Sequence, residues 1–288
     1  MSGTAGRRGG TSRGTLYVVA TPLGNLGDLS PRAAETLRQA SVVAAEDTRR
    51  TRGLLSHLGA SPTLLSFHAH SGDRRMDTLL GILGEGRDVA LVTDAGTPGV
   101  SDPGTDLVGA ALEAGFTVVP IPGPSAVATA LSAAGIPADH YLFLGFVPRR
   151  GAERSRLLGR AATEEWSVVF FEAPTRLVTL LTDLAATAGP GRRALVAREL
   201  TKLHEELRAG TLAELADYYS EVPPRGELTI VMEGTGSPPP APDRTADAAE
   251  AAAALLAEGL SRREVARRLT ETLGMSRNDA YRLVTGLP

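Results

Sequence analysis

The sequence of 288 residues contains no cysteine and only one lysine, and both shortages limit what the protein can do. Without cysteine, a disulfide framework, a thiolate nucleophile and a cysteine-ligated metal site are excluded. Of the 30 basic residues, 29 are arginine and one is Lys202, so this single ammonium group becomes a candidate functional residue. Aromatic residues make up only 4% of the chain, which argues against a surface that stacks single-stranded bases.

Long apolar runs are also missing. No run of about 18 apolar residues occurs, which excludes a membrane-spanning helix. Residues 1–14 are mainly Gly, Ser, Thr and Arg and lack the apolar stretch of a signal peptide, so a disordered tail is expected there. The net charge of −3 excludes a general polycation, and any nucleic-acid site must be a local patch. These features together predict a soluble, cytoplasmic protein.

Two common nucleotide motifs are absent. Neither a Walker lysine pattern nor G-x-G-x-x-G occurs, so nucleoside triphosphates and dinucleotides lose their main support as ligands. His68 and His70 have the spacing of a metal pair, but the chain has no cysteine and no nearby pair of carboxylates to complete it. No metal is therefore expected.

Short apolar runs alternate with amphipathic stretches over the first 122 residues. Ser30-Pro31 has the form of an N-cap followed by proline at the first helical position. This alternation predicts an α/β layer with a mainly parallel sheet. The expected strands are 16–21, 41–45, 63–67, 88–93 and 116–120. A first helix is expected to begin after Ser30, and three more are expected at 48–58, 76–83 and 106–114.

From Gly123 the rhythm changes, beginning with an Ala-rich helix at 127–134. The boundary is placed at Pro122-Gly123-Pro124, because proline and glycine end both neighbours. The second half of the chain predicts a separate α/β or α+β domain and then an extended proline-rich linker. The expected strands are 141–146, 167–171, 193–198 and 227–233, and the expected helices are 153–162, 176–188 and 212–219.

The residues after the linker predict a small helical module. The segments 261–264 (S-R-R-E) and 276–279 (S-R-N-D) resemble capping boxes, and Gly274 ends the helix between them. With a helix at 246–256 in front, the last two helices could form a helix-turn-helix. The expected organisation is a tail at 1–14, α/β domains at 15–122 and 123–235, the linker at 236–245 and the helical module at 246–288.

Three clusters rich in glycine and proline come directly after expected strands, at residues 22–27, 94–104 and 121–126. Ligands of open α/β sheets bind beyond the carboxyl ends of strands, where glycine lets the backbone approach closely. One such cluster alone is most simply a tight turn. Three of them at strand ends can line one pocket.

Seven motifs in order across residues 16–234 resemble a known family. They are V-A-T-P-L-G-N-L-G-D, A-E-D-T-R, D-A-G-T-P-G-V-S-D-P-G, I-P-G-P-S-A, F-L-G-F-V-P-R, F-F-E-A-P-T-R and A-R-E-L-T-K-L-H-E-E. The set is similar to that of the ribosomal small subunit 2′-O-ribose methyltransferase I family, which has the tetrapyrrole methylase fold.

This resemblance implies a two-domain α/β fold, tetrapyrrole-methylase-like, of the class III S-adenosylmethionine (SAM) methyltransferases, with a small C-terminal helix-turn-helix-like module. It also implies a homodimer that holds SAM between its α/β domains and methylates the 2′-oxygen of a cytidine in the decoding region of 16S rRNA. Tetrapyrrole enzymes of this fold carry G-D-P where this chain has Gly96-Thr97-Pro98, which favours the RNA branch. The implied SAM contacts are Leu23, Gly24, Asp94, Gly96, Thr97, Val100, Ser101, Ser125, Ala126 and Phe171.

The methyl group of SAM is already activated, so alignment and exclusion of water should dominate catalysis. A base that eases proton loss from the 2′-hydroxyl could add roughly 10²–10⁴-fold. Lys202 is favoured as this base because the pKa of a lysine, unlike that of an arginine, can fall on burial, so that lysine accepts a proton. The alternative is that Lys202 only forms an ion pair with Glu205 or Glu206 one turn away. The candidate catalytic residues are Lys202, Glu172 and Glu46, with Asp47 and Glu199 as further candidates.

Two groups of arginines are candidates for gripping RNA phosphates, which carry most nucleic-acid affinity. Solvated arginine faces are common, so a plain surface role competes with this hypothesis. The first group lies on one short helix and the second on a loop and the start of the next helix: Arg49, Arg50 and Arg52, then Arg149, Arg150, Arg154 and Arg156.

Two other functions remain open at this stage. One is methylation of a tetrapyrrole of the precorrin type, against which the missing G-D-P and the added helical module argue. The other is a SAM-sensing regulator whose helix-turn-helix reads DNA. The expected recognition helix at 277–283 has only two arginines, and the seven enzyme motifs would then go unused.

Overall fold

The computed structural model describes residues 13–69, 71–236, 245–257, 259–273 and 277–286. The chain divides into two compact units, residues 1–238 and 239–288, each with a hydrophobic core of its own. The expected tail and linker fall largely outside the described residues, at 1–12 and 237–244, and so does His70.

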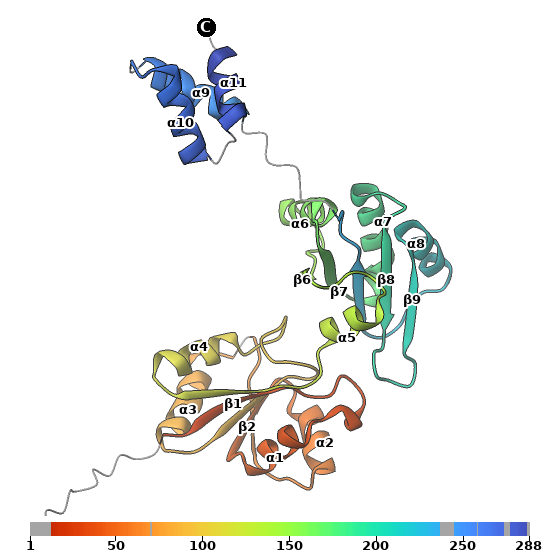
Figure 1. Cartoon of the computed structure of the whole chain (residues 1–288). Helices are drawn as coiled ribbons and strands as arrows, with labels where there is room; N and C mark the ends of the chain where they lie inside the picture. Colours follow the sequence, from red (N-terminus) through yellow and green to blue (C-terminus); the bar gives the residue numbers. More distant parts are fainter. Residues whose placement is uncertain (1–12, 70, 237–244, 258, 274–276, 287–288) are drawn as a thin grey trace, which may run out of the picture. The chain divides into compact units, whose positions relative to one another are not determined.

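Five strands of the first unit form a parallel sheet in the order β3-β2-β4-β1-β5. Every residue of β2 and β4 is buried, as expected of parallel strands covered by helices on both faces. Helices α3 and α4 cover one face and α1 and α2 the other (Figure 1). These elements are β1 (Thr15–Val19), α1 (Pro31–Gln39), β2 (Val42–Ala45), α2 (Thr48–His57), β3 (Thr63–Ser66), α3 (Asp73–Gly84), β4 (Val89–Val92), α4 (Thr105–Glu113) and β5 (Thr117–Ile121).

The first helix begins as the sequence predicts. Ser30 accepts a hydrogen bond from the backbone N–H of Ala33 at 3.1 Å, and Pro31 occupies the first helical position. Because all five strands run in the same direction, the loops after them gather at one edge of the sheet. That edge carries the three glycine- and proline-rich clusters.

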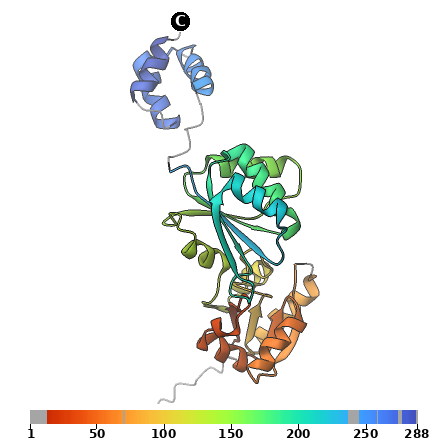
Figure 2. The same cartoon turned by 90° about the vertical axis from the view of Figure 1, so that its right-hand side faces the viewer.

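The second sheet is mixed, in the order β6-β7-β10-β8-β9. Strands β6 and β7 are parallel, whereas β10 is antiparallel to both β7 and β8. Helices α6, α7 and α8 pack on one face, and α5 packs on the other (Figure 2). These elements are α5 (Ala126–Ala133), β6 (Tyr141–Phe146), α6 (Ala152–Thr163), β7 (Ser167–Glu172), α7 (Leu177–Ala188), β8 (Arg193–Arg198), β9 (Glu206–Thr211), α8 (Leu212–Glu221) and β10 (Leu228–Met232).

One strand, β9, has no counterpart among the strands expected from the sequence. Its residues Glu206–Thr211 (E-L-R-A-G-T) contain no apolar run, and none of them is fully buried. The strand exists because it pairs with β8 along its whole length at the edge of the sheet. That pairing is a long-range contact, which local periodicity does not reveal.

The second unit consists of α9 (Thr245–Ala257), α10 (Arg262–Leu273) and α11 (Arg277–Gly286) around a small core that includes Val265 and Val284. The capping box at 261–264 is confirmed, since Ser261 and Glu264 exchange side-chain and backbone hydrogen bonds. The second expected box begins at Ser276, which lies outside the described residues. Every helix in the described ranges is too short or too polar to cross a membrane.

Candidate functional site

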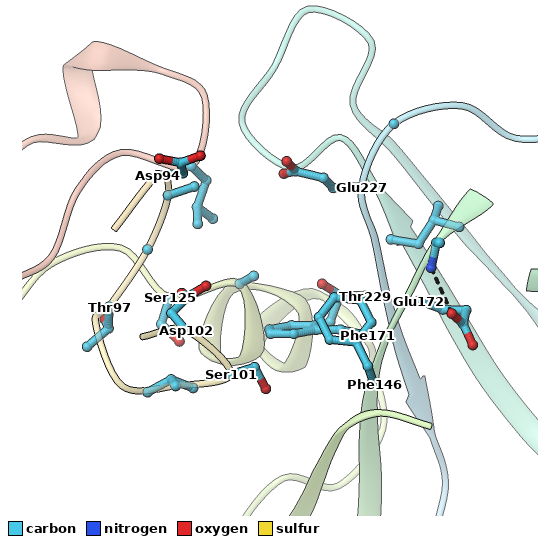
Figure 3. Close-up of a pocket in the computed structure, with 18 of the residues that line it drawn as sticks. Asp94, Thr97, Ser101, Asp102, Ser125, Phe146, Phe171, Glu172, Glu227 and Thr229 are labelled. Carbon is cyan, nitrogen blue, oxygen red and sulfur yellow. Dashed lines mark hydrogen bonds between the residues drawn. The ribbon is translucent and has the colours of Figure 1, made fainter. Parts of the chain in front are cut away.

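A cavity of about 430 Å³ lies where the loops after β1, β4 and β5 meet strand ends of the second sheet. Figure 3 shows Asp94 and Asp102 across this space from Phe171 and Thr229. Its volume falls within the range of small-molecule sites, about 300–1,000 Å³. Nine of the ten residues expected to contact SAM line it, namely Leu23, Asp94, Gly96, Thr97, Val100, Ser101, Ser125, Ala126 and Phe171.

Backbone and side-chain hydrogen bonds tie the three loops together. Thr21 and Gly96 exchange backbone hydrogen bonds of 2.8 and 3.0 Å, which join the first loop to the second. The hydroxyl of Thr97 donates to the carbonyl oxygen of Pro124 at 3.1 Å, which joins the second loop to the third. Gly96 has a φ of 82°, a conformation that L side chains rarely adopt, so glycine is required here.

Gly24 is the expected SAM contact that does not line the cavity. A Cβ atom at this position would lie only 2.2 Å from Cγ of Lys202. In this structure, the missing side chain at Gly24 lets the aliphatic stem of Lys202 pack directly against the first loop.

An aromatic group forms the wall contributed by the second sheet. The ring of Phe171 lies 4.9 Å from that of Phe143 and 5.6 Å from that of Phe146, measured between centroids. Phe146 lines the cavity although 55% of its surface is exposed. This wall therefore offers a flat apolar surface to a ligand.

Carboxylates gather on the cavity wall. Asp94 accepts a hydrogen bond from the backbone N–H of Asp47 at 3.0 Å and lies 3.5 Å from Arg50. Burial, together with the charges of Glu46, Asp94 and Glu227, raises the pKa of Asp102 to about 7. Burial and the charge of Asp94 also raise the pKa of Glu46.

Glu172, a candidate catalytic residue, lines the cavity with a fully buried side chain. Its Oε1 accepts from the backbone N–H of Ala173 at 2.8 Å, as Figure 3 shows. Its Oε2 lies 3.1 Å from Arg176 without the geometry of a hydrogen bond. Burial raises the pKa of Glu172, and the N–H of Ala173 and the charge of Arg176 oppose that rise.

Lys202, the favoured catalytic candidate, does not line the cavity and is held by two carboxylates. Its Nζ lies 2.9 Å from Glu199 and 3.1 Å from Glu227, rather than near Glu205 or Glu206. Burial lowers the pKa of Lys202, but the hydrogen bonds to Glu199 and Glu227 outweigh burial and raise it above its usual value. A lysine in this environment keeps its proton, which is the opposite of what a base requires.

The other two candidate bases are also committed to partners. The carboxylate of Asp47 caps α2 and binds Arg49, whose hydrogen bonds lower the pKa of Asp47 to about 2. Burial raises the pKa of Glu199, but hydrogen bonds from the N–H of Glu227 and from Lys202 lower it by more, so the pKa lies below its usual value. Neither residue lines the cavity.

The expected RNA-binding arginines occupy two places. In α2, Arg50 lines the large cavity, while Arg49 pairs with Asp47 and Arg52 is exposed. A second hollow of about 290 Å³ is lined by Arg149, Arg154, Thr175, Arg176 and Thr179. Arg150 and Arg156 are exposed and lie outside this hollow.

Several cavity residues were missed by sequence reasoning, most importantly Asp102 and Glu227. Asp102 lies within the second glycine-rich cluster, so its position was a usable signal, whereas Glu227 comes from a different sheet. Among the described residues, no group of three or more His, Asp or Glu side chains is arranged to hold a metal ion.

The sequence and the fold are similar to known methyltransferases. Residues 15–216 match the family model of the tetrapyrrole (corrin/porphyrin) methylases. A ribosomal RNA small subunit methyltransferase I from a Synechocystis species is 43% identical over 94% of this chain and 97% of its own. Proteins of the same name from Escherichia coli O157:H7 and Micromonospora olivasterospora are 41% and 45% identical, over 94% and 96% of this chain and 94% and 84% of their own.

Solved structures with the same fold are more distant in sequence. A uroporphyrin-III-C-methyltransferase from Thermus thermophilus aligns with a TM-score of 0.54 at 23% identity, over 76% of this chain and 94% of its own. The methyltransferase CobJ aligns with a TM-score of 0.59 at 21% identity, over 77% of this chain and 95% of its own. The expected fold class, two α/β layers of the tetrapyrrole methylase type with C-terminal helices after them, is thereby confirmed.

Proposed function

Because the chain belongs to the tetrapyrrole methylase family, and within it to the ribosomal RNA small subunit methyltransferase I family, it is a SAM-dependent methyltransferase, and we propose that it methylates the ribose 2′-hydroxyl of a cytidine in the decoding region of 16S rRNA. The observation that carries this proposal is the identity of 41% to 45% with relatives of that name over almost the whole chain.

The cavity suits SAM in shape and in chemistry. The apolar wall at Phe146 and Phe171 matches an adenine ring, and the carboxylates of Glu46 and Asp94 match cationic groups. Gly96 lines the cavity without a side chain, so a ligand can approach the loop backbone there. When bound there, SAM supplies an activated methyl group on a sulfonium, so the chain itself has to align the acceptor and exclude water.

The distribution of charged residues suggests where the ribose and the phosphates of an RNA substrate would bind. The cavity wall carries Glu46, Asp94, Asp102 and Glu227, which would admit an uncharged ribose and repel a phosphate. Of the candidate RNA-binding arginines, Arg50 lines the cavity, where it lies 3.5 Å from Asp94, and the others lie outside it, in α2 or at positions 149 and 150. We therefore assign RNA phosphates to Arg49, Arg50, Arg52, Arg149 and Arg150.

The same charges disfavour a tetrapyrrole substrate. Precorrin-type molecules are flat and acidic, and the carboxylates on the cavity wall would oppose their entry. A DNA-reading regulator is disfavoured as well, because the sequence of α11, the expected recognition helix, contains only two arginines, Arg277 and Arg282.

The proposal is tested by incubating the full chain with labelled SAM and either small ribosomal subunits lacking the modification or a tetrapyrrole mixture. We expect label only in 16S rRNA, on one cytidine, with the adjacent phosphodiester bond resistant to alkali because the 2′-oxygen is blocked. Label on a base, or transfer only to tetrapyrroles, would refute it.

Two accompanying proposals concern assembly and location. We propose that the protein forms a homodimer. The proposal is supported by Leu203, a large apolar side chain that is 92% exposed in the single chain and that a second copy could cover. Light scattering at micromolar concentration tests the dimer, and a monomeric mass would exclude it. A cytoplasmic location follows from a ribosomal substrate and is tested by fractionation.

A further inference from the structure

We propose that the hollow lined by Arg149, Arg154, Thr175, Arg176 and Thr179 is a site for one phosphate group of the RNA strand that carries the target ribose. The proposal rests on the proposed function and deepens it. Arg149 and Arg154 were among the arginines that the sequence suggested, whereas Arg176 and the two threonines join them only in the folded structure.

Three segments of the chain meet at this hollow. Arg149 lies in the loop after β6, and Arg154 lies in the first turn of α6. Thr175 and Arg176 belong to a short 3₁₀ turn, Pro174–Arg176, and Thr179 belongs to the first turn of α7. Helices α6 and α7 pack against each other, so donors from distant parts of the sequence converge on one space.

Two of the arginines are fixed before any ligand arrives. Arg154 donates a hydrogen bond to the carbonyl oxygen of Pro148 at 2.9 Å, and Arg176 donates one to the carbonyl oxygen of Val147. Both side chains are largely buried, with exposed fractions of 11% and 23%. These bonds also hold the loop that carries Arg149. A site organised in this way loses little conformational freedom on binding.

The hollow contains more positive than negative charge. Asp183 pairs with Arg154, and Glu172 lies 3.1 Å from Arg176. Arg149 forms no ion pair with any described residue, so one positive charge has no counter-ion. Arg176 meets its partners through Nη2, and within the described part of the chain its Nε and Nη1 form no hydrogen bond. Guanidinium N–H groups arranged in this way suit the oxygens of a phosphate.

The beginning of α7 supplies further donors. This helix of 12 residues has no side-chain cap at its N-terminus, where the helix dipole favours an anion. Further along α7, Thr182 and Thr187 donate their hydroxyls to the helix carbonyls of Val178 and Asp183 at 2.9 and 2.8 Å.

The threonines of the hollow differ from those two. Among the described residues, neither Thr175 nor Thr179 has a hydrogen-bond partner for its hydroxyl, although both line the hollow. Both are exposed, so a ligand can reach them from solvent. A bracing role explains Arg154 and Arg176, but it does not explain two free hydroxyls and an unpaired Arg149 beside them. A phosphate oxygen accepts from all of these groups.

The hollow adjoins the cavity at one ion pair. Glu172 lines the cavity, and its Oε2 lies 3.1 Å from Arg176, which lines the hollow. The carboxylates of the cavity repel a phosphate, so a strand whose ribose enters the cavity must leave its phosphates outside. A basic site next to the cavity wall accepts one of them and thereby fixes how the ribose enters.

The first test places a carboxylate in the hollow. In Thr179→Glu the new negative group lies among the arginines and takes the place of the phosphate. The control is Thr187→Glu, which adds the same charge to α7 at an exposed residue outside the hollow. Binding of small ribosomal subunits, measured by filter binding, should be at least ~10-fold weaker in Thr179→Glu than in Thr187→Glu. SAM affinity by calorimetry should be equal in the two variants.

A second pair of variants changes no charge. Thr175→Val/Thr179→Val removes the two free hydroxyls, and Thr182→Val/Thr187→Val removes two that are bonded within the helix. The first pair should bind subunits at least ~5-fold more weakly than the second, because hydrogen bonds to a charged group are lost only in the hollow. Circular dichroism should show the same helix content in both.

A third measurement uses inorganic phosphate and no RNA. The melting temperature is compared in phosphate and in chloride at equal ionic strength. Phosphate strengthens apolar burial in any protein, so the variants are compared with one another. The additional stabilisation by phosphate should be present in wild type and in Thr187→Glu and absent in Thr179→Glu.

The outcomes separate this proposal from the proposed function. A wild type that binds small subunits and methylates none refutes the proposed function, while the binding and melting comparisons still judge the hollow. Equal subunit affinity in Thr179→Glu and Thr187→Glu overturns the RNA phosphate site. If phosphate nevertheless stabilises only the proteins with an intact hollow, the site holds an adventitious ion only. Equal stabilisation by phosphate in all three proteins shows that the hollow binds no anion.

Discussion

Lys202 Nζ lies 3.1 Å from Oε2 of Glu227, which connects the only lysine of the chain to a carboxylate on the cavity wall. The loop around Lys202 is strained, because Glu199 and Thr201 have φ values of 52° and 66°. Such conformations in residues with side chains cost about 1–3 kcal/mol and cluster at functional sites. We infer that Lys202 is a positioning residue that holds Glu227 and shields its charge.

Replacing Lys202 tests that role. Lys202→Met and Lys202→Arg should each lower the single-turnover methylation rate at least tenfold, about 1.4 kcal/mol, with SAM affinity preserved. Methionine removes the charge beside Glu227, and arginine is too bulky beside Gly24. Arg208→Met is the control, since Arg208 pairs with Glu206 away from the cavity. Rates within a factor of two of wild type would make Lys202 an ordinary surface ion pair.

Gly24 should act through Lys202 rather than through SAM. A Cβ atom in Gly24→Ala would lie 2.2 Å from Cγ of Lys202, and the flexible lysine stem would have to move. We expect Gly24→Ala to slow methylation and to add little to the loss in Lys202→Met. A double-mutant cycle measures this coupling, and independent, additive losses would contradict it.

The SAM site is tested by a bulky side chain that fills the cavity, introduced at a position that is not a glycine with positive φ. Val100 lines the cavity and is 37% exposed, so Val100→Trp should fold normally and weaken SAM binding at least ~10-fold, measured by calorimetry. Leu112→Trp is the control, since Leu112 is 58% exposed on α4 and outside the cavity. Equal SAM affinity in both variants would remove Val100 from the site.

The arginine hollow should contribute to RNA affinity. Arg149 forms no ion pair with any described residue and lines a hollow with Arg154 and Arg176, whereas the neighbouring Arg150 lies outside it. Both Arg149→Ala and Arg150→Ala should weaken binding to small subunits, the first more strongly. The slope of log affinity against log salt should fall by about 1 for Arg149→Ala. An unchanged slope would show that Arg149 meets no phosphate.

Removal of the C-terminal unit tests its role in docking. Residues 239–288 form a compact unit of their own, so a chain ending at Pro238 should keep its fold and its SAM affinity. We expect weaker binding to small ribosomal subunits, measured by sedimentation or filter binding. A truncated enzyme that binds and modifies subunits as well as the full chain would exclude a docking function.

Local sequence patterns predicted most of the secondary structure. Strands β6 (Tyr141–Phe146) and β8 (Arg193–Arg198) were predicted at their observed bounds, because each is a short apolar run between turn residues. Strand β9 was missed, because an edge strand with polar residues is stabilised mainly by its partner. The predicted domain boundaries remain predictions.

By itself, the sequence determined which loops line the cavity, because glycine-rich turns at strand ends are local features of the chain. It also determined the family, because the ordered motifs are local features as well. Only the tertiary structure decided which charged groups face one another. Glu227 reaches Asp102 and Lys202 from positions 125 and 25 residues away in the chain. A pKa depends on such distances and on burial, so the chemistry of Asp102 and Lys202 emerges only when the two sheets are folded.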